Sequence, residues 1–179
     1  SDGQFSSMLA WNPLLDRLFP NGLMLKDAEA HRYDRKILQG AFKKASIEGY
    51  LHTMSPHLER GLEEWPKGKE FHFQHAVKQL LLEVAAEVFL GVEMGEEASG
   101  VNTAFVDTML ASMAVLKLPI PGTLWHRGLT GRKHLEDFVM AHIDDKRKHE
   151  GRDIFSQICH ATDEDGNYFS DEAVRDHII

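Results

Sequence analysis

The 179-residue sequence contains a single cysteine, Cys159. One cysteine excludes an intramolecular disulfide, a zinc site built from several cysteines and an iron–sulfur cluster held by several thiolates. A lone thiol fits a reducing compartment, and we expect a cytoplasmic protein. Basic residues are also scarce, with 20 Lys and Arg against 28 Asp and Glu. The net charge of −8 argues against a nucleic-acid binder, because phosphate binding needs a basic surface.

Targeting signals and long apolar runs are absent as well. The first five residues lack the basic and apolar regions of a signal peptide. The most apolar stretch, residues 80–92, is interrupted by Glu83 and Glu87 and is too short to cross a bilayer. We therefore expect no membrane span.

Strand-like alternation is missing too, apart from a fragment at residues 71–73. Helical patterns joined by Pro/Gly turns take its place, without an internal repeat or a low-complexity linker. The proportions of 42% hydrophobic and 27% charged residues are typical of a globular protein. We predict an all-α fold in which residues 1–179 form one helical unit.

Apolar spacing and turn residues predict where the helices lie. The predicted segments are residues 8–18, 27–41, 46–65, 74–90, 101–117, 130–150 and 153–161, and one from residue 170 onward. Pro56 should kink or split the third segment. The fourth is apolar nearly all the way round, so we expect it to be central and buried, with Gly91 as its C-terminal cap.

Three polar residues are predicted to cap helix N-termini, namely Asp27, Asp153 and Ser170. The helix that Ser170 opens reaches the bulky pair Ile178–Ile179 without a cap or a basic last turn. One interpretation is a short helix docked into the core. We favour the other, a chain cut inside a longer buried helix.

The eleven histidines do not form a recognisable metal motif. No histidine has a glutamate three residues before it, as a di-iron bundle requires, and residues 149–150 lack the second histidine of a zinc-protease motif. The loop at residues 163–171 fails as a calcium loop, because placing Gly166 at the required glycine puts Ala161 at the first ligand position. We expect no metal site, and a buried core position for Cys159.

One pair of residues has more chemical content. His31 and Arg35 are four residues apart on a predicted helix, so both can donate hydrogen bonds to one anion. Residues 26–44 contain six basic and three acidic residues, a local charge of +3. A solvated helix face explains this pattern, and so does an anion site beside a docking surface for an acidic partner.

The pattern around this pair resembles a known family. Residues 21–42, with His31, Arg35 and the following Lys36, resemble the segment of cytochrome P-450 that enters helix C. Residues 83–92 resemble helix E, and residues 153–179 resemble helix H, its turn and the first turns of helix I. The haem-ligand loop Phe-x-x-Gly-x-Arg-x-Cys, the Glu-x-x-Arg of helix K and the acid–Thr pair of helix I are missing. The chain therefore resembles the distal helical part of the fold, without its N-terminal sheet and its haem-cysteine half.

The resemblance implies roles for particular residues. His31 and Arg35 would contact the haem propionates, and Cys159 would not bind iron. The surface for a ferredoxin- or flavodoxin-type electron donor would contain Arg32, Lys36, Lys43 and Lys44. The substrate pocket would contain Phe5, Met8, Leu9, Phe105, Met109, Met113 and Leu116, although ordinary core packing also explains each of these residues singly.

The resemblance implies the substrate-recognition part of a monooxygenase that hydroxylates an apolar small molecule. Without the thiolate, this chain should hold no catalytic residue, bind haem poorly and be inactive alone. Self-association through the face left by the missing half is a further expectation. The alternative is a non-catalytic helical protein that binds an apolar ligand or another protein.

Overall fold

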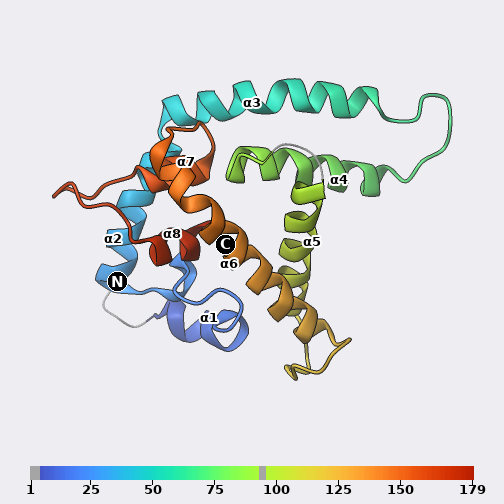
Figure 1. The fold of residues 1–179 in the computed structure, drawn as a ribbon. Helices are drawn as coiled ribbons and strands as arrows, with labels where there is room; N and C mark the ends of the chain where they lie inside the picture. The colour runs from blue at the N-terminus through green and yellow to red at the C-terminus, as the bar shows by residue number, and fades with distance from the viewer. Residues whose placement is uncertain (1–4, 93–95) are drawn as a thin grey trace.

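The computed structural model describes residues 5–92 and 96–179, whose regular elements are all helices (Figure 1). The only β-type pairing among these residues is an isolated bridge between Thr162 and Tyr168. The predicted all-α class is therefore confirmed. The elements are α1 (Ser7–Leu15), η1 (Leu23–Leu25), α2 (Ala28–Leu38), η2 (Gln39–Phe42), α3 (Lys44–Glu63), α4 (Phe73–Ala85), η3 (Ala86–Leu90), α5 (Glu96–Ala111), α6 (Leu124–Lys148), α7 (Ile154–Cys159) and α8 (Asp171–Ile178).

Two long hairpins organise the molecule. Helices α3 and α4 run antiparallel and extend to the right in Figure 1, while α5 and α6 run side by side below them. The main hydrophobic core lies where α4, η3, α5, α6, α7 and α8 meet. A smaller cluster of Leu18, Ala111 and Trp125 fixes the chain after α1 to the far ends of α5 and α6.

Glycines allow α5 and α6 to approach closely. A Cβ atom added at Gly131 of α6 would lie 2.5 Å from the carbonyl oxygen of Ala104, and one at Gly128 would overlap the side chain of Ala111. The buried hydroxyl of Thr108 donates to the carbonyl of Ala104 at 2.8 Å inside this contact. The same glycines weaken the helical signal of the sequence. The prediction that this helix starts at Thr130 is therefore wrong, since α6 begins at Leu124.

Three of the four predicted helix caps are formed, and the fourth, Asp27, is not. Asp153 accepts from the N–H of Ser156 at 2.8 Å, and the hydroxyl of Ser170 accepts from the N–H of Ala173 at 3.2 Å, as predicted. Gly91 ends η3 in the left-handed conformation, also as predicted. Asp27 precedes α2, but its side chain makes no capping bond to that helix.

The carboxylate of Asp27 instead contacts α1, the preceding helix. It accepts from the N–H groups of Ser7 and Met8 at 2.8 and 3.3 Å, in the first turn of α1. The hydroxyl of Ser6 also donates to it, and this bond is the main reason why the pKa of Asp27 is lowered. Asp27 therefore joins α1 to the start of α2.

Two further expectations about helices need correction. Pro56 does not split α3, which continues through it at an exposed position where the freed carbonyl can face water. The segment predicted to be buried all round is only partly covered by its neighbours α3, α5 and α7. Leu81 and Phe89 of this segment are 55% and 50% exposed.

Candidate functional site

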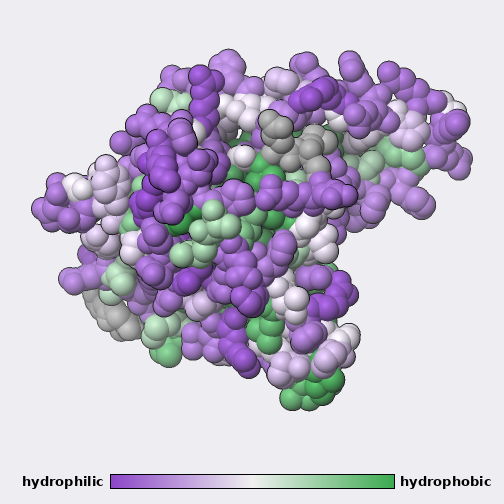
Figure 2. All heavy atoms as spheres, in the orientation of Figure 1, coloured by the Kyte–Doolittle hydropathy of each residue, from purple (hydrophilic) through white to green (hydrophobic). Residues whose placement is uncertain are grey.

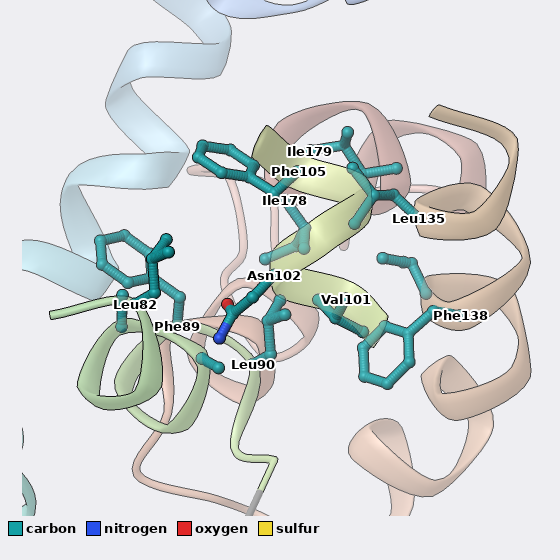
Figure 3. Close-up of a pocket in the computed structure, with 13 residues that line it drawn as sticks. Leu82, Phe89, Leu90, Val101, Asn102, Phe105, Leu135, Phe138, Ile178 and Ile179 are labelled. Carbon is teal, nitrogen blue, oxygen red and sulfur yellow. The ribbon is translucent and has the colours of Figure 1, made fainter. Parts of the chain in front are cut away.

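An apolar cavity lies between η3, α5, α6 and α8 (Figure 3). Its volume is about 220 Å³. Asn102 of α5 is the one polar side chain among its thirteen lining residues. The lining residues are Leu82, Ala85, Ala86, Phe89, Leu90, Val101, Asn102, Phe105, Leu135, Phe138, Val139, Ile178 and Ile179.

Local backbone geometry brings the aromatic walls to this cavity. Helix α4 widens into the single π-turn η3, and both Phe89 and Leu90 from this turn face the cavity in Figure 3. π-Turns of this kind are frequent at functional sites. On the opposite wall, the ring of Phe138 packs against the imidazole of His142 with 4.3 Å between centroids. The cavity can accept an apolar molecule and offers one amide for orientation.

The structure brings one of the seven predicted pocket residues to this cavity. Phe105 lines it, and Met109 is one helical turn further along α5. Met113 and Leu116 lie beyond the end of α5 and are 81% and 71% exposed. Both residues belong to the loop between α5 and α6, which Figure 1 places at the lower right, where Figure 2 shows an apolar tip.

The other three predicted pocket residues are on or next to α1. Phe5, Met8 and Leu9 are exposed and do not line the cavity. The carboxylate of Asp27 holds the beginning of α1, so these side chains are connected to the helix that contains His31 and Arg35. All seven predicted pocket residues are thus exposed, and Phe105 alone of the seven lines the cavity.

His31 and Arg35 lie one turn apart on α2, as their spacing predicts. His31 is half-buried and Arg35 is exposed. Arg35 makes no ion pair with any residue that the structure describes, so its guanidinium is available to an anion. The two side chains could supply the anion-binding edge of a larger site.

The four predicted docking cations differ in their partners. Lys36 forms an ion pair with Glu164, and Lys44 lies 3.7 Å from Glu48 in its own helix. The Nε of Arg32 donates to the carbonyl of Ala28 at 3.4 Å, and neither Arg32 nor Lys43 pairs with a carboxylate within residues 5–92 and 96–179. The basic face is therefore partly neutralised by the chain itself.

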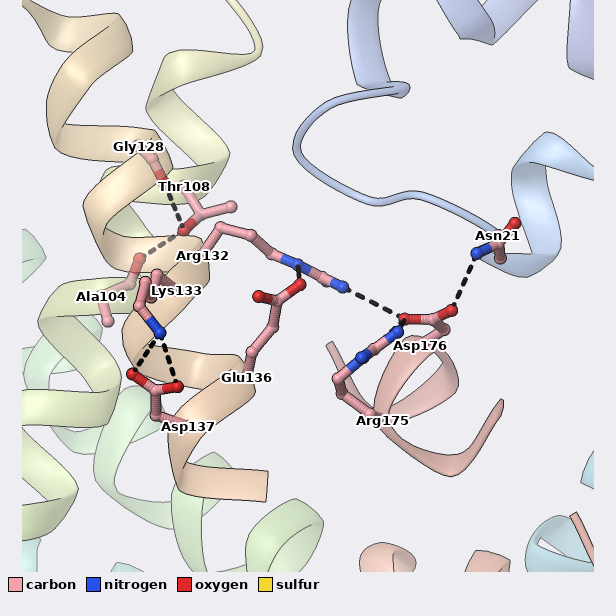
Figure 4. Close-up of polar contacts among 10 residues, drawn as sticks. All are labelled: Asn21, Ala104, Thr108, Gly128, Arg132, Lys133, Glu136, Asp137, Arg175 and Asp176. Atoms are coloured by element: carbon pink, nitrogen blue, oxygen red, sulfur yellow. Dashed lines mark hydrogen bonds and ion pairs between the residues drawn. The ribbon is translucent and has the colours of Figure 1, made fainter. Parts of the chain in front are cut away.

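Sequence reasoning missed a buried polar network that connects α8 to the N-terminal elements. Asp176 accepts from Nη2 of the buried Arg132 at 3.3 Å and from the amide of Asn21 at 3.0 Å (Figure 4). The Nε of Arg132 donates to Glu136 at 2.9 Å. Because the partners are 44 and 155 residues apart, no local pattern could have indicated these pairs.

A second pair lies one residue further along α8. The Nε2 atom of His177 is 3.1 Å from Oδ2 of Asp34, and Lys26 forms an ion pair with the same carboxylate. Asp34 is on α2, between His31 and Arg35 in sequence. The two anion-binding candidates are thus on a helix that the buried charge of Asp34 ties to α8 and to Lys26.

Within residues 5–92 and 96–179, the side chains that could donate to a metal are not arranged as an iron site. The thiol of Cys159 is buried in the core, as predicted, and burial raises its pKa to about 11. Among the described residues no three His, Cys, Asp or Glu side chains gather as metal ligands. The histidines at positions 72, 75, 134 and 149 are exposed. Asp163 uses its carboxylate to accept from the N–H groups of Asp165 and Asn167, which fits a turn.

No helix within residues 5–92 and 96–179 is long and apolar enough to cross a membrane.

Comparison with known proteins gives the same fold. The chain is 36% identical over 178 residues to putative cytochrome P450 136 of Mycobacterium tuberculosis, covering 97% of the chain and 36% of that protein. It is 27% identical over 184 residues to taxane 13-alpha-hydroxylase of Taxus cuspidata, covering 93% of the chain and 38% of the relative. No family model matches the sequence.

Solved structures agree with these relatives. Retinoic acid-bound cyanobacterial CYP120A1 superposes with a TM-score of 0.76 at 26% identity, covering 90% of the chain and 37% of that structure. The cytochrome P450DA heme domain superposes with a TM-score of 0.79 over 98% of the chain and 41% of that structure, and its 20% identity supports the fold alone.

These findings define the chain as an all-α segment of a haem-protein fold. The chain belongs to the cytochrome P450 family, and it spans about a third of the length of the curated relatives it matches.

Proposed function

We propose that this chain is the substrate-recognition part of a cytochrome P450 monooxygenase that hydroxylates an apolar small molecule. The apolar cavity supports this proposal most directly, because Asn102 is the one polar side chain that lines it. The names of related proteins, a hydroxylase among them, agree with this reaction class. The amide of Asn102 would orient a substrate that is otherwise held by apolar contacts.

The pocket set predicted from the sequence is part of this proposal. Phe105 contacts the substrate inside the cavity, and Met109 lies at the same face of α5. The more exposed Phe5, Met8, Leu9, Met113 and Leu116 would contact an apolar substrate during entry. Their exposure supports this role, since large apolar side chains left in water favour contact with an apolar ligand or neighbour.

We also propose that His31 and Arg35 hold the haem propionates. The guanidinium of Arg35 forms no ion pair with any described residue, and the imidazole of His31 is half-buried. Both support this role, because they can donate to carboxylates from one helix. Bound haem would supply oxygen activation. Cys159 is unsuited to be its thiolate ligand, since the raised pKa keeps the thiol protonated. The chain alone would therefore bind haem weakly and be inactive.

The electron donor is proposed to be an acidic protein of ferredoxin or flavodoxin type. Arg32, Lys36, Lys43 and Lys44 are all exposed and lie on α2 or at the start of α3. A basic face on a chain of net charge −8 steers an acidic partner to one place. A cytoplasmic location and self-association of the chain through its uncovered apolar surface complete the proposal.

Visible absorption spectra test this function. The chain with added haem, reduced under carbon monoxide, should not give a thiolate-type Soret band, whereas the full-length protein should give one that shifts with an apolar substrate. Arg35→Gln should reduce haem occupancy in the full-length protein. Arg32→Gln removes the same charge from the same helix and should not. A thiolate-type band from the chain alone would contradict the proposal.

A further inference from the structure

A short acidic hairpin lies against the basic face of α2. Residues 162–168 form it, closed by the bridge between Thr162 and Tyr168. The hydroxyl of Tyr33 on α2 donates to Oδ2 of Asp163 at 2.9 Å, and the ammonium group of Lys36 pairs with Glu164. The contacts join positions about 130 residues apart in sequence. This hairpin is therefore a tertiary neighbour of the proposed docking surface.

The hairpin is organised before any partner arrives. Oδ1 of Asp163 accepts from the N–H groups of Asp165 and Asn167 at 2.9 and 2.8 Å. Gly166 adopts a φ of +81°, which a residue with a side chain rarely allows. Because Asp163 is fixed from within, the backbone that carries Glu164 is held beside α2.

The hairpin carries the same charge as the proposed electron donor, because both are acidic. Asp163, Glu164 and Asp165 are three consecutive acids beside a surface that we propose to bind an acidic protein. Glu164 takes the ammonium group of Lys36, whereas Arg32 and Lys43 pair with no carboxylate among the described residues. An incoming carboxylate can reach Arg32 or Lys43 directly, but it must displace Glu164 to reach Lys36.

We propose that this acidic hairpin is an internal competitor for the electron donor, with Glu164 occupying the site on Lys36 that an acidic side chain of the donor would take. The inference rests on the proposed function, since it names the regulation of that same surface. The hairpin would select donors whose carboxylates match Arg32 and Lys43 and would weaken the binding of other acidic proteins.

The test compares two substitutions that remove one negative charge each, in the full-length haem protein. Glu164→Gln breaks the contact with Lys36, while Asp165→Asn changes a neighbouring carboxylate that forms no ion pair with α2. The dissociation constant for an acidic [2Fe–2S] ferredoxin is measured at low and high ionic strength. Glu164→Gln should tighten binding about two- to five-fold at low salt, the range that exposed ion pairs give, and Asp165→Asn should have a smaller effect.

A double-mutant cycle identifies competition. If Glu164 acts by occupying Lys36, the gain from Glu164→Gln should be lost in a Lys36→Ala background. Both proteins should fold, because the side chains of Lys36 and Glu164 are 61% and 78% exposed.

Equal gains from Glu164→Gln and Asp165→Asn, each independent of Lys36, would overturn the inference, because a general charge effect would then suffice. So would an unchanged affinity in Glu164→Gln while Arg32→Gln and Lys43→Gln weaken binding, a result that keeps the docking surface. If Arg32→Gln and Lys43→Gln leave the affinity unchanged too, the proposed surface fails along with the inference.

Discussion

The imidazole of His177 on α8 lies 3.1 Å from the carboxylate of Asp34 on α2, with its side chain 1% exposed. Burial lowers the pKa of His177 more than the attraction of Asp34 raises it, and Lys26 opposes protonation as well. The neutral imidazole is therefore the form that the folded chain favours. This contact connects the helix of the proposed haem-propionate pair to the last helix of the chain.

The buried histidine predicts a loss of stability in acid. The folded-state pKa of His177 lies below its ordinary value of 6.5, so protonation favours the unfolded chain. This contribution to the free energy of unfolding should be intact above pH 6.5 and should fall as the pH drops below that value. His177→Phe should flatten the dependence between about pH 7 and 5, as measured by urea unfolding. An equally steep dependence in that variant would contradict the assignment to His177.

The close contact between α5 and α6 predicts opposite effects for two glycine substitutions. Gly131→Ala would place its methyl group 2.5 Å from the carbonyl oxygen of Ala104, a backbone atom that cannot move aside easily. It should lower the free energy of unfolding by about 1–3 kcal/mol, as overpacking does. Gly49→Ala in α3 has no atom within 4 Å of the added group and should raise it by about 0.5–1 kcal/mol. Thermal unfolding of both variants tests the contrast.

Local chemistry made several features predictable. Ser170, Asp153 and Gly91 occupy their predicted capping roles because each acts on residues within one turn. Gly128 and Gly131 misled the prediction, because their effect on α6 depends on packing against α5. For the same reason Asp27 was placed correctly before α2, while its long-range bond to the start of α1 could not be predicted.

The candidate site was less predictable than the helices. Phe105 was identified through a family resemblance, whereas Phe89, Leu135 and Ile179 come to the cavity from separate elements. Each of these residues belongs to an ordinary apolar helix pattern in the sequence. Only the tertiary arrangement shows whether such a residue lines a cavity or packs in the core. Glu164 shows the same limit, since its pairing with Lys36 depends on a hairpin far along the chain.

The buried pair of Arg132 and Asp176 predicts a recoverable loss of stability. Asp176→Leu removes the carboxylate 3.3 Å from the guanidinium of Arg132 and leaves a buried cation with Glu136 alone. The free energy of unfolding should fall by about 3 kcal/mol. Adding Arg132→Met should restore part of it, because the double variant no longer buries the Arg132 cation without its partner. The part not restored includes the lost contact with Arg175, which pairs with the same carboxylate at 2.8 Å. Urea unfolding of the single and double variants checks this, and additive losses would contradict a coupled pair.

The burial of Cys159 predicts that its thiol reacts only when the protein unfolds locally or globally. Burial raises its pKa from 9.0 to about 11, against a smaller opposing effect of Arg147. Two pKa units reduce the thiolate fraction at pH 8 about 100-fold, before any steric protection is counted. Alkylation by iodoacetamide should therefore be at least that much slower in buffer than in concentrated urea. Fast alkylation of the folded protein at pH 8 would mean that the thiol is accessible and ionised, and would reopen the question of Cys159 as a haem ligand.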